Sequence, residues 1–375
     1  MHRRGVSSLA PIAVPDLSIL IVNTQSRDLL LLCLDAVQRE LGDSGWRVIP
    51  AGSDAAKVDL GRARWTGLEP MPIASTTDRT AEVLVLDNAS TDGSAAAAAS
   101  HPVEPEVIAL ERRQGKGDSD SDLLARATGT YGLLLNEDAE LQPGSLAALV
   151  KALDDDPGAA AVGAKLVRPD GTPQPSAWAF PSVFGAITTA FQRPDRVVQS
   201  VGDETHRVDW AQSAALLVRV EMAREIGFFD RDFFVYSDEV DFQKRLAEAG
   251  HHVLWTPHAT VIHHEQLSTD LARAQRRIVE FHRGRDRYLR KHHGTAARLV
   301  ITWLTVLTYA GRALAATALK GHSPARYWAH AKAAARPSRG EGLREAAAQF
   351  NAELDRAAAG SGVIGLGLHP RADES

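Results

Sequence analysis

The sequence is poor in several features that mark particular classes of protein. It contains one cysteine, Cys33, in 375 residues, which excludes a disulfide framework and a cysteine-rich zinc site. It has no excess of basic residues, because 42 Lys and Arg are set against 47 Asp and Glu. Without a positive field to attract phosphates, we expect no nucleic acid among its partners. The scarcity of cysteine is typical of a cytoplasmic protein.

Long hydrophobic runs are missing as well. The longest apolar run in the C-terminal part, 299–311, falls short of the about 20 residues that cross a bilayer. It contains Trp303 and is followed by Arg312, so two interpretations stay open: a helix packed on the protein body, or a peripheral membrane contact through 299–320. The second interpretation would place the protein at the inner face of the cell membrane.

Apolar runs rich in β-branched residues alternate with segments of helical spacing in the first half of the chain. Residues 17–22 and 82–86 are two such runs, and each is followed by a helical segment. Because strands that alternate with helices form a parallel sheet covered on both faces, we expect an α/β fold with a mostly parallel central sheet flanked by helices. With 44% hydrophobic residues, the chain can bury a large core.

The composition changes along the chain and predicts its organisation. We expect a flexible N-terminus (1–16), a main domain (17–294) with a surface insertion (42–80), a C-terminal helical extension (295–368) and a tail (369–375). Inside the main domain we expect a helix over 143–153, a loop-rich stretch over 165–209, and two short strands at 253–255 and 260–262.

Polar residues follow directly after three of the predicted strands, where a parallel sheet binds its ligands. Asn136 and Asp138 project to the same side, since side chains alternate along an extended segment. An amide oxygen and a carboxylate suit Mg²⁺ or Mn²⁺ that also binds phosphate oxygens. The alternative is an ordinary polar turn with Asp138 as a cap.

Asp87, followed by Asn88, can accept hydrogen bonds from a base or ribose, or can form an Asx-turn and helix cap.

Three carboxylates in four residues open a predicted helix near residue 239. They favour the positive end of the helix, and their mutual repulsion can raise one pKa enough to make a usable base. Asp241 has Arg245 four residues later on the same helical face, which favours a structural ion pair and leaves Glu239 or Asp238 as the candidate base. The alternative is simple charge complementarity with the helix dipole.

Further on, His263 ends a predicted strand, where it can complete a metal shell or form a buried hydrogen bond.

Several motifs in this order resemble one family. The sequence resembles the inverting family 2 glycosyltransferases with the GT-A fold, most closely their bacterial rhamnosyltransferase-like branch. The stretches that carry the resemblance are LSILIVNTQSRDLLLLCLDAV, VLVLDNASTDGS, GTYGLLLNEDAEL, VDWAQSAALLVR, IGFFDRDFFVYSDEVDFQKRLAEAGHHVLWTPHATVIHH and FHRGRDRYLRKHHG. They cover roughly residues 17–294, apart from the insertion.

The resemblance implies an inverting, metal-dependent hexosyltransferase. It would move a sugar, with rhamnose as one candidate, from a nucleotide-diphospho-sugar to a hydroxyl of a saccharide or lipid-linked acceptor in polysaccharide or cell-envelope synthesis. It would use Mg²⁺ or Mn²⁺. The matching positions are Asn23, Asp87, Asn88, Asn136 and Trp210 for the nucleotide-sugar, Asp138 and His263 for the metal, and Glu239 with Asp238 beside it for catalysis.

The sequence departs from the family pattern in four places. Residues 114–121 lack the usual aromatic and Asn pair, and Thr24 and Gln25 replace another common pair. Gln212 and Ser213 stand where Ser and Gly are more usual, and the base position holds Glu where Asp is common. The alternative function is therefore a catalytically weak nucleotide-sugar-binding scaffold of the same fold. A homodimer also stays open.

Overall fold

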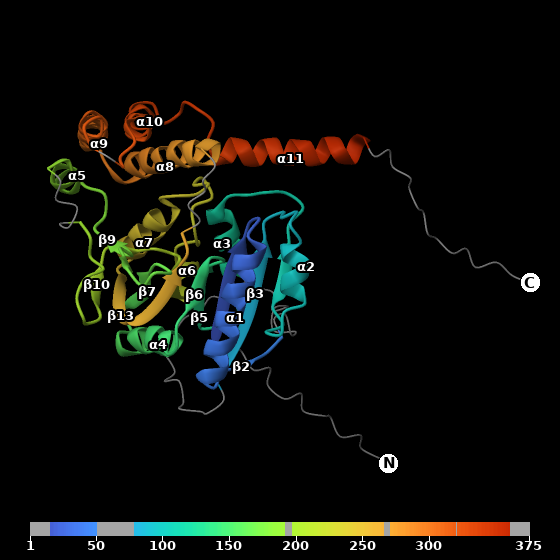
Figure 1. Cartoon of the computed structure of the whole chain (residues 1–375). Helices are drawn as coiled ribbons and strands as arrows, with labels where there is room; N and C mark the ends of the chain where they lie inside the picture. The colour runs from blue at the N-terminus through green and yellow to red at the C-terminus, as the bar shows by residue number, and fades with distance from the viewer. Residues whose placement is uncertain (1–15, 51–78, 192–196, 266–270, 320, 361–375) are drawn as a thin grey trace, which may run out of the picture.

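A mixed eleven-stranded sheet forms the centre of the molecule, with helices on both faces and a layer of C-terminal helices at one end (Figure 1). The computed structural model describes residues 16–50, 79–191, 197–265, 271–319 and 321–360. The predicted tail 369–375, almost all of the N-terminus 1–16 and most of the insertion 42–80 lie outside these residues.

The helices and strands have the following bounds. The strands are β1 (Leu17–Asn23), β2 (Arg47–Val48), β3 (Thr80–Asp87), β4 (Glu106–Ala109), β5 (Tyr131–Asn136), β6 (Ala139–Leu141), β7 (Ala159–Val167), β8 (Pro173–Gln174), β9 (Ala177–Trp178), β10 (His206–Val208), β11 (Trp210–Ala211), β12 (Ala215–Arg219) and β13 (His252–His263). The helices are α1 (Arg27–Asp43), α2 (Ser94–Ala99), α3 (Lys116–Arg126), α4 (Ser145–Asp155), α5 (Val183–Ala190), α6 (Val220–Glu225), α7 (Asp238–Glu248), α8 (Leu271–His292), α9 (Thr295–Ala315), α10 (Pro324–Ala335) and α11 (Leu343–Gly360).

The first five strands, β1 to β5, run parallel, as predicted, whereas β6 runs antiparallel to β13. β1 lies between β3 and β5, and its last residues Val22 and Asn23 pair with Asn136 and Asp87. This register brings the polar residues that follow three strands to one edge of the sheet. The second half is mixed, since β12 runs antiparallel to both β5 and β7, while β7 and β13 are parallel.

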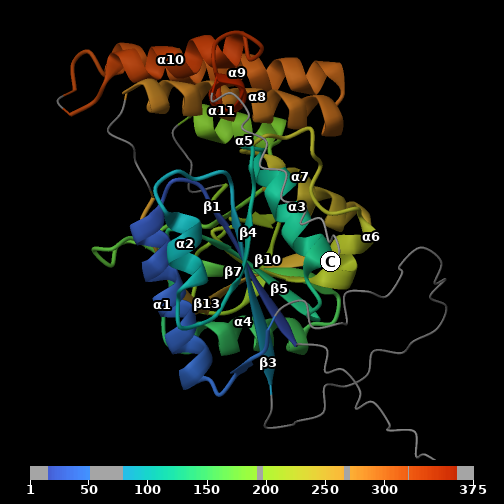
Figure 2. The same ribbon diagram turned by 90° about the vertical axis from the view of Figure 1, so that its right-hand side faces the viewer.

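Two cores lie on opposite faces of the sheet because successive side chains of a strand point to opposite sides. In β1, Ile19 and Ile21 pack with α1 and α4 on one face, while Leu20 packs with α3, α6 and α7 on the other. Figure 2 shows α1 and α2 on one side of the strands and α3, α6 and α7 on the other. The α/β architecture with a buried central sheet is therefore confirmed.

Three local predictions need correction. The stretch 165–209 contains, in addition to loops, the end of β7, the short strands β8, β9 and β10, and the helix α5. The two short strands predicted near 253–262 are one strand, β13, with an irregular register between Thr256 and Thr260. The helix predicted over 143–153 begins at Ser145, because Gly144 adopts a left-handed conformation at φ 82° and caps it.

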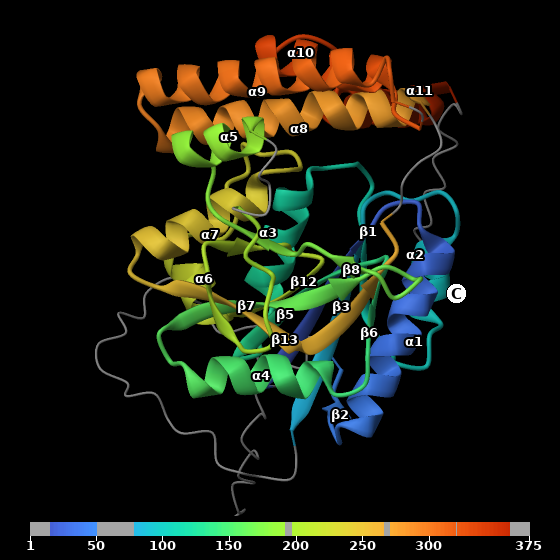
Figure 3. The same ribbon diagram turned by 60° about the vertical axis from the view of Figure 1, so that its left-hand side comes forward.

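The C-terminal helices α8–α11 cover one end of the α/β body, next to α5 (Figure 3). The predicted boundary at 294/295 falls between α8 and α9, so α8 belongs by sequence to the main domain and by packing to the helical layer. The division into domains stays a prediction. No helix in the described parts of the chain combines the length and hydropathy that crossing a membrane requires.

Candidate active site

Asn23 and Asp87 meet where β1 and β3 end. The side-chain amide of Asn23 donates to Asp87 Oδ1 at 2.7 Å, and the other carboxylate oxygen accepts from the backbone of Ser90 at 3.0 Å. Both side chains are buried. The buried Oδ1 of Asn23 has no hydrogen-bond partner in the described structure, which is unusual for a buried polar atom. The pair fixes the two loops and places a carboxylate at the edge of the sheet where the sequence predicts the nucleotide site.

Asn88 connects the same edge to the loop that precedes α3. Its amide group donates to the carbonyl of Gln114 at 3.1 Å and accepts from the backbone N–H of Gln114 at 2.9 Å. Both functions of the amide are thus committed to the backbone of one residue. The structure therefore shows Asn88 positioning a loop beside the predicted nucleotide site.

Asn136, Asp138 and His263 come together, although the histidine lies more than 120 residues further along the chain. β6 pairs with β13 so that His263 lies opposite Ala139. The imidazole Nε2 lies 3.3 Å from Asp138 Oδ1 and 3.5 Å from the Asn136 amide nitrogen. The other ring nitrogen lies 3.1 Å from the side-chain amide of Gln174, which orients the ring from behind. Asp138 and His263 are both buried.

The chemistry of this donor set fits Mg²⁺ or Mn²⁺. A carboxylate, an imidazole nitrogen and an amide oxygen supply two or three ligands, and a site of this kind takes the remaining ligands from substrate phosphates. Within the described residues, no group of three or more His, Cys, Asp and Glu could hold an ion by itself. The neighbouring His264 is committed elsewhere, since its Nε2 lies 2.6 Å from Glu140 Oε1.

Asp238 and Glu239 begin α7 after a strained turn. Tyr236 and Ser237 both have positive φ, 65° and 62°, a left-handed conformation that non-glycine residues adopt at a cost of about 1–3 kcal/mol each. Burial raises the pKa of Asp238 to about 7; Lys116 opposes this shift, and Glu239 adds to it. The half-buried Glu239 accepts a hydrogen bond from the backbone N–H of Ser213 at 2.7 Å.

Asp241 has the structural role that its spacing predicts. Its fully buried carboxylate accepts a hydrogen bond from Arg245 Nε at 2.8 Å. Lys291 Nζ and His292 Nε2 of α8 each lie 2.8 Å from its other oxygen. Asp241 therefore ties α7 to α8, and the base candidates remain Asp238 and Glu239.

Lys116 is a central cation that the sequence analysis did not single out. Its Nζ donates to Asp120 at 2.6 Å and to the hydroxyl of Ser213 at 3.3 Å. Burial alone would lower the pKa of the lysine, but Asp120 and Asp238 raise it above its ordinary value, so the group stays charged. It lies in the stretch 114–121 that departs from the family pattern. The spacing of four residues to Asp120 on α3 is a local signal of that ion pair. The contacts with Ser213 and Asp238 have no such signal, because these residues come from distant segments.

The segment from Trp210 to Ala214 joins the two acidic clusters. The backbone N–H of Asn136 donates to the carbonyl of Ala214 at 3.0 Å, and the preceding residue, Ser213, donates to Glu239. Consecutive residues span at most about 3.6 Å each, so the metal-binding candidates and the base candidates share one edge of the sheet. Trp210 stacks on Trp178 at 4.7 Å and borders this edge.

Gln243 of α7 holds the same segment in place. It accepts from the backbone N–H of Ala211 at 2.8 Å and donates to the carbonyl of that residue at 2.7 Å. The Gln243 side chain is buried, so these two bonds are shielded from water. The helix that carries the base candidates thus also fixes the segment beside them.

Comparisons with known proteins show which proteins this chain is similar to. The model of the family described as "Glycosyl transferase family 2" matches residues 73–200. An N-acetylglucosaminyl-diphospho-decaprenol L-rhamnosyltransferase of Mycobacterium tuberculosis is 29% identical over 252 residues, which are 60% of this chain and 80% of that protein. An O-antigen biosynthesis protein of Myxococcus xanthus is 30% identical over 194 residues, 50% of this chain and 15% of that protein.

Among solved structures, a mannosyltransferase of Pyrobaculum calidifontis in complex with GDP-Man and Mn²⁺ is 18% identical with a TM-score of 0.45. The match covers 94% of this chain and 78% of that one.

Proposed function

Because the chain belongs to glycosyltransferase family 2, we propose that it transfers a sugar, with inversion, from a nucleotide-diphospho-sugar to a hydroxyl of a lipid-linked saccharide. L-Rhamnose is the sugar proposed, since the rhamnosyltransferase of M. tuberculosis is 29% identical to this chain. The observation that carries the proposal is the shared edge of the sheet, where Ser213 and Ala214 connect Glu239 to Asn136.

The donor would lie with its diphosphate toward β5 and β13. Asp138, His263 and the amide oxygen of Asn136 are the residues that would hold a divalent ion with the diphosphate. When bound, the ion offsets the negative charge that the leaving diphosphate gains. The Asp87 carboxylate, fixed by Asn23, would accept hydrogen bonds from the base or ribose at the other end of the donor.

The acceptor hydroxyl is a weak nucleophile and must lose its proton as the new bond forms. Glu239 is half-buried, reaches the segment 210–214 and is proposed as the base, a role typically worth about 10²–10⁴-fold in rate. Asp238 is buried beside it, and its raised pKa allows it to share the proton. Lys116 balances the charge of the acidic groups on this side of the site.

An apolar surface suggests where the acceptor's membrane would lie. Helices α5 and α9 pack together and expose large apolar side chains. Those more than half exposed are Phe184 of α5, Phe191 directly after α5, and Trp303, Leu307 and Leu314 of α9. Large exposed apolar patches mark interaction surfaces. We therefore extend the proposal to a peripheral membrane contact through α9, inside the stretch 299–320.

The experiment is a transfer assay with a panel of nucleoside-diphosphate sugars, rhamnose donors included, and a lipid-linked saccharide, each with and without Mn²⁺. The proposal predicts transfer that needs the ion and a product of inverted anomeric configuration. A scaffold protein would bind a donor without transferring or hydrolysing it. Retention of configuration would refute the single-displacement mechanism.

A further inference from the structure

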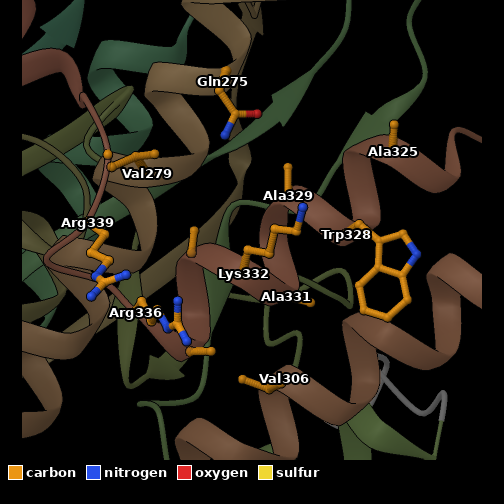
Figure 4. A pocket seen from close by; sticks show the side chains of 13 residues that line it. Gln275, Val279, Val306, Ala325, Trp328, Ala329, Ala331, Lys332, Arg336 and Arg339 are labelled. Atoms are coloured by element: carbon orange, nitrogen blue, oxygen red, sulfur yellow. The ribbon is translucent and has the colours of Figure 1, made fainter.

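The helical layer contains a large open groove whose lining includes none of the residues proposed for the reaction. It has a volume of about 1130 Å³ and lies between α8, α9, α10 and the chain that follows α10. Figure 4 shows its lining, with Trp328 at one end, Arg336 and Arg339 at the other, and Lys332 between them. All of its lining residues come from the C-terminal helices and the chain that follows α10, and none comes from the edge of the sheet that carries Asp138.

The walls of the groove are apolar. Val279 of α8 and Val306 of α9 face a run of alanines on α10, of which Ala329 and Ala331 are two. Small side chains on α10 leave space between the helices that larger ones would fill. The indole of Trp328 is 41% exposed, and such rings commonly lie at the boundary between lipid and water.

Three cations that line the groove have no acidic partner among the residues that the structure describes. Lys332, Arg336 and Arg339 are exposed, and none forms an ion pair with a carboxylate in the described parts of the chain. Nearby arginines do pair, for example Arg276 with Glu341 at 3.5 Å and Arg283 with Glu345 at 2.9 Å. In a chain with a net charge of −5, three unpaired cations around an apolar groove form a local anion-binding surface.

The chain that follows the cationic end of the groove contacts the loop that precedes α7, the helix that begins with Asp238 and Glu239. After Arg339, the carbonyl of Gly340 accepts from Arg283 at 3.2 Å. Arg344 then donates to the carbonyl of Asp232 at 2.7 Å and lies over the ring of Phe234. The carbonyl of Phe234 in turn accepts a hydrogen bond from the backbone N–H of Lys116. The groove therefore has a direction, from Trp328 to the loop that precedes α7.

From these observations we infer that the groove binds an isoprenoid lipid that carries a diphosphate headgroup. The chain would lie along Val279, Val306 and Ala329, and the headgroup would lie at Lys332, Arg336 and Arg339. Three cations match a diphosphate better than the single charge of a common phospholipid. This inference rests on the proposed function, because such a lipid would be the carrier of the acceptor saccharide.

The test measures binding of farnesyl diphosphate to the full chain by calorimetry, in EDTA so that no ion bridges diphosphate to the catalytic site. The unchanged chain is expected to bind it at least tenfold more tightly than farnesol or inorganic diphosphate. The triple variant Lys332→Gln, Arg336→Gln, Arg339→Gln is expected to lose at least tenfold in affinity. The control triple variant Arg47→Gln, Arg126→Gln, Arg224→Gln removes three exposed arginines of the α/β body and is expected to bind normally.

A second variant tests the apolar part of the groove. Ala329→Trp fills the groove and is expected to weaken farnesyl diphosphate binding at least tenfold, with an unchanged urea midpoint as the check on folding. Equal binding by both triple variants would overturn the inference. The inference would also be overturned if a second copy of the chain occupied the groove. That result would appear as a dimer that dissociates in the triple variant of Lys332, Arg336 and Arg339.

The failure of this inference is distinguishable from the failure of the proposed function. The unchanged chain is also assayed with a water-soluble saccharide acceptor, which needs no lipid groove. Transfer to that acceptor without farnesyl diphosphate binding would contradict the groove alone. Binding of farnesyl diphosphate without transfer to any acceptor would contradict the proposed function.

Discussion

Replacement of Glu239 by Gln separates proton transfer from every other role of this side chain. In the structure, Glu239 Oε2 accepts a hydrogen bond from the backbone N–H of Ser213 at 2.7 Å. The amide oxygen of Gln can accept the same bond, so the segment 210–214 should keep its position. What the amide cannot do is take a proton from the acceptor hydroxyl.

The expected loss in Glu239→Gln is about 10²–10⁴-fold in kcat, the usual worth of a positioned base. At 1.36 kcal/mol per factor of ten, this corresponds to about 3–5 kcal/mol of transition-state stabilisation. The affinity for the nucleotide-sugar should change less than about threefold, because the proposed donor contacts come from Asp138, His263 and Asp87. The assay is steady-state transfer, with donor affinity measured by calorimetry.

Glu248→Gln serves as the matched control. It lies on the same helix, half-exposed, with Lys244 Nζ at 3.3 Å, and it is distant in sequence from the strained turn. We expect normal turnover in this variant. The reasoning would be refuted if Glu239→Gln kept more than a tenth of the turnover, or if donor binding fell as much as transfer did.

The remaining predictions concern the neighbouring acidic groups and the packing of α8. Asp238→Asn should stabilise the fold increasingly from about pH 4 to about pH 8, by about 2–4 kcal/mol at the upper end. The reason is that a carboxyl with its pKa raised from 3.8 to about 7 destabilises the folded state as it ionises. Urea unfolding at both pH values checks this, and a stability difference that does not change with pH would contradict it. Asp241→Asn should cost about 3–5 kcal/mol in urea unfolding and leave donor affinity unchanged; weaker donor binding would speak against its structural role. Asp138→Asn should remove the gain in donor affinity that Mn²⁺ gives, at least about tenfold in calorimetry, and an undiminished gain would argue against a metal ligand here. Gly284→Ala places a Cβ 2.4 Å from the carbonyl oxygen of Tyr236, so turnover should fall while donor affinity holds; normal turnover would show that the turn before α7 tolerates displacement.

The grouping of polar residues at one edge of the sheet was predictable from the sequence for a simple reason. Parallel strands end at one edge, so polar residues that follow buried apolar runs must lie close together, as Asn23, Asp87 and Asn136 do. The structural role of Asp241 was predictable in the same way, since its partner Arg245 lies one helical turn away.

Features that depend on distant segments were not predictable from local patterns. The ion pair of Lys116 with Asp120 follows from their spacing on α3, but its contacts with Ser213 and Asp238 depend on segments about 100 residues further along the chain. The helix α5 is short and follows a proline-rich stretch, and its packing against α9 supplies the stability that its sequence lacks. In β13, Pro257 interrupts the apolar pattern, but the strand continues past it through an irregular register.

The most direct test of the central claim is a crystal structure of Glu239→Gln with a nucleotide-diphospho-sugar and Mn²⁺. The account predicts an ion that contacts Asp138 and His263 together with the diphosphate, and a side chain at position 239 that faces the anomeric carbon from the side opposite to the diphosphate. An ion bound at 238 and 239, or a donor with its diphosphate on the same side of the sugar as position 239, would contradict the account.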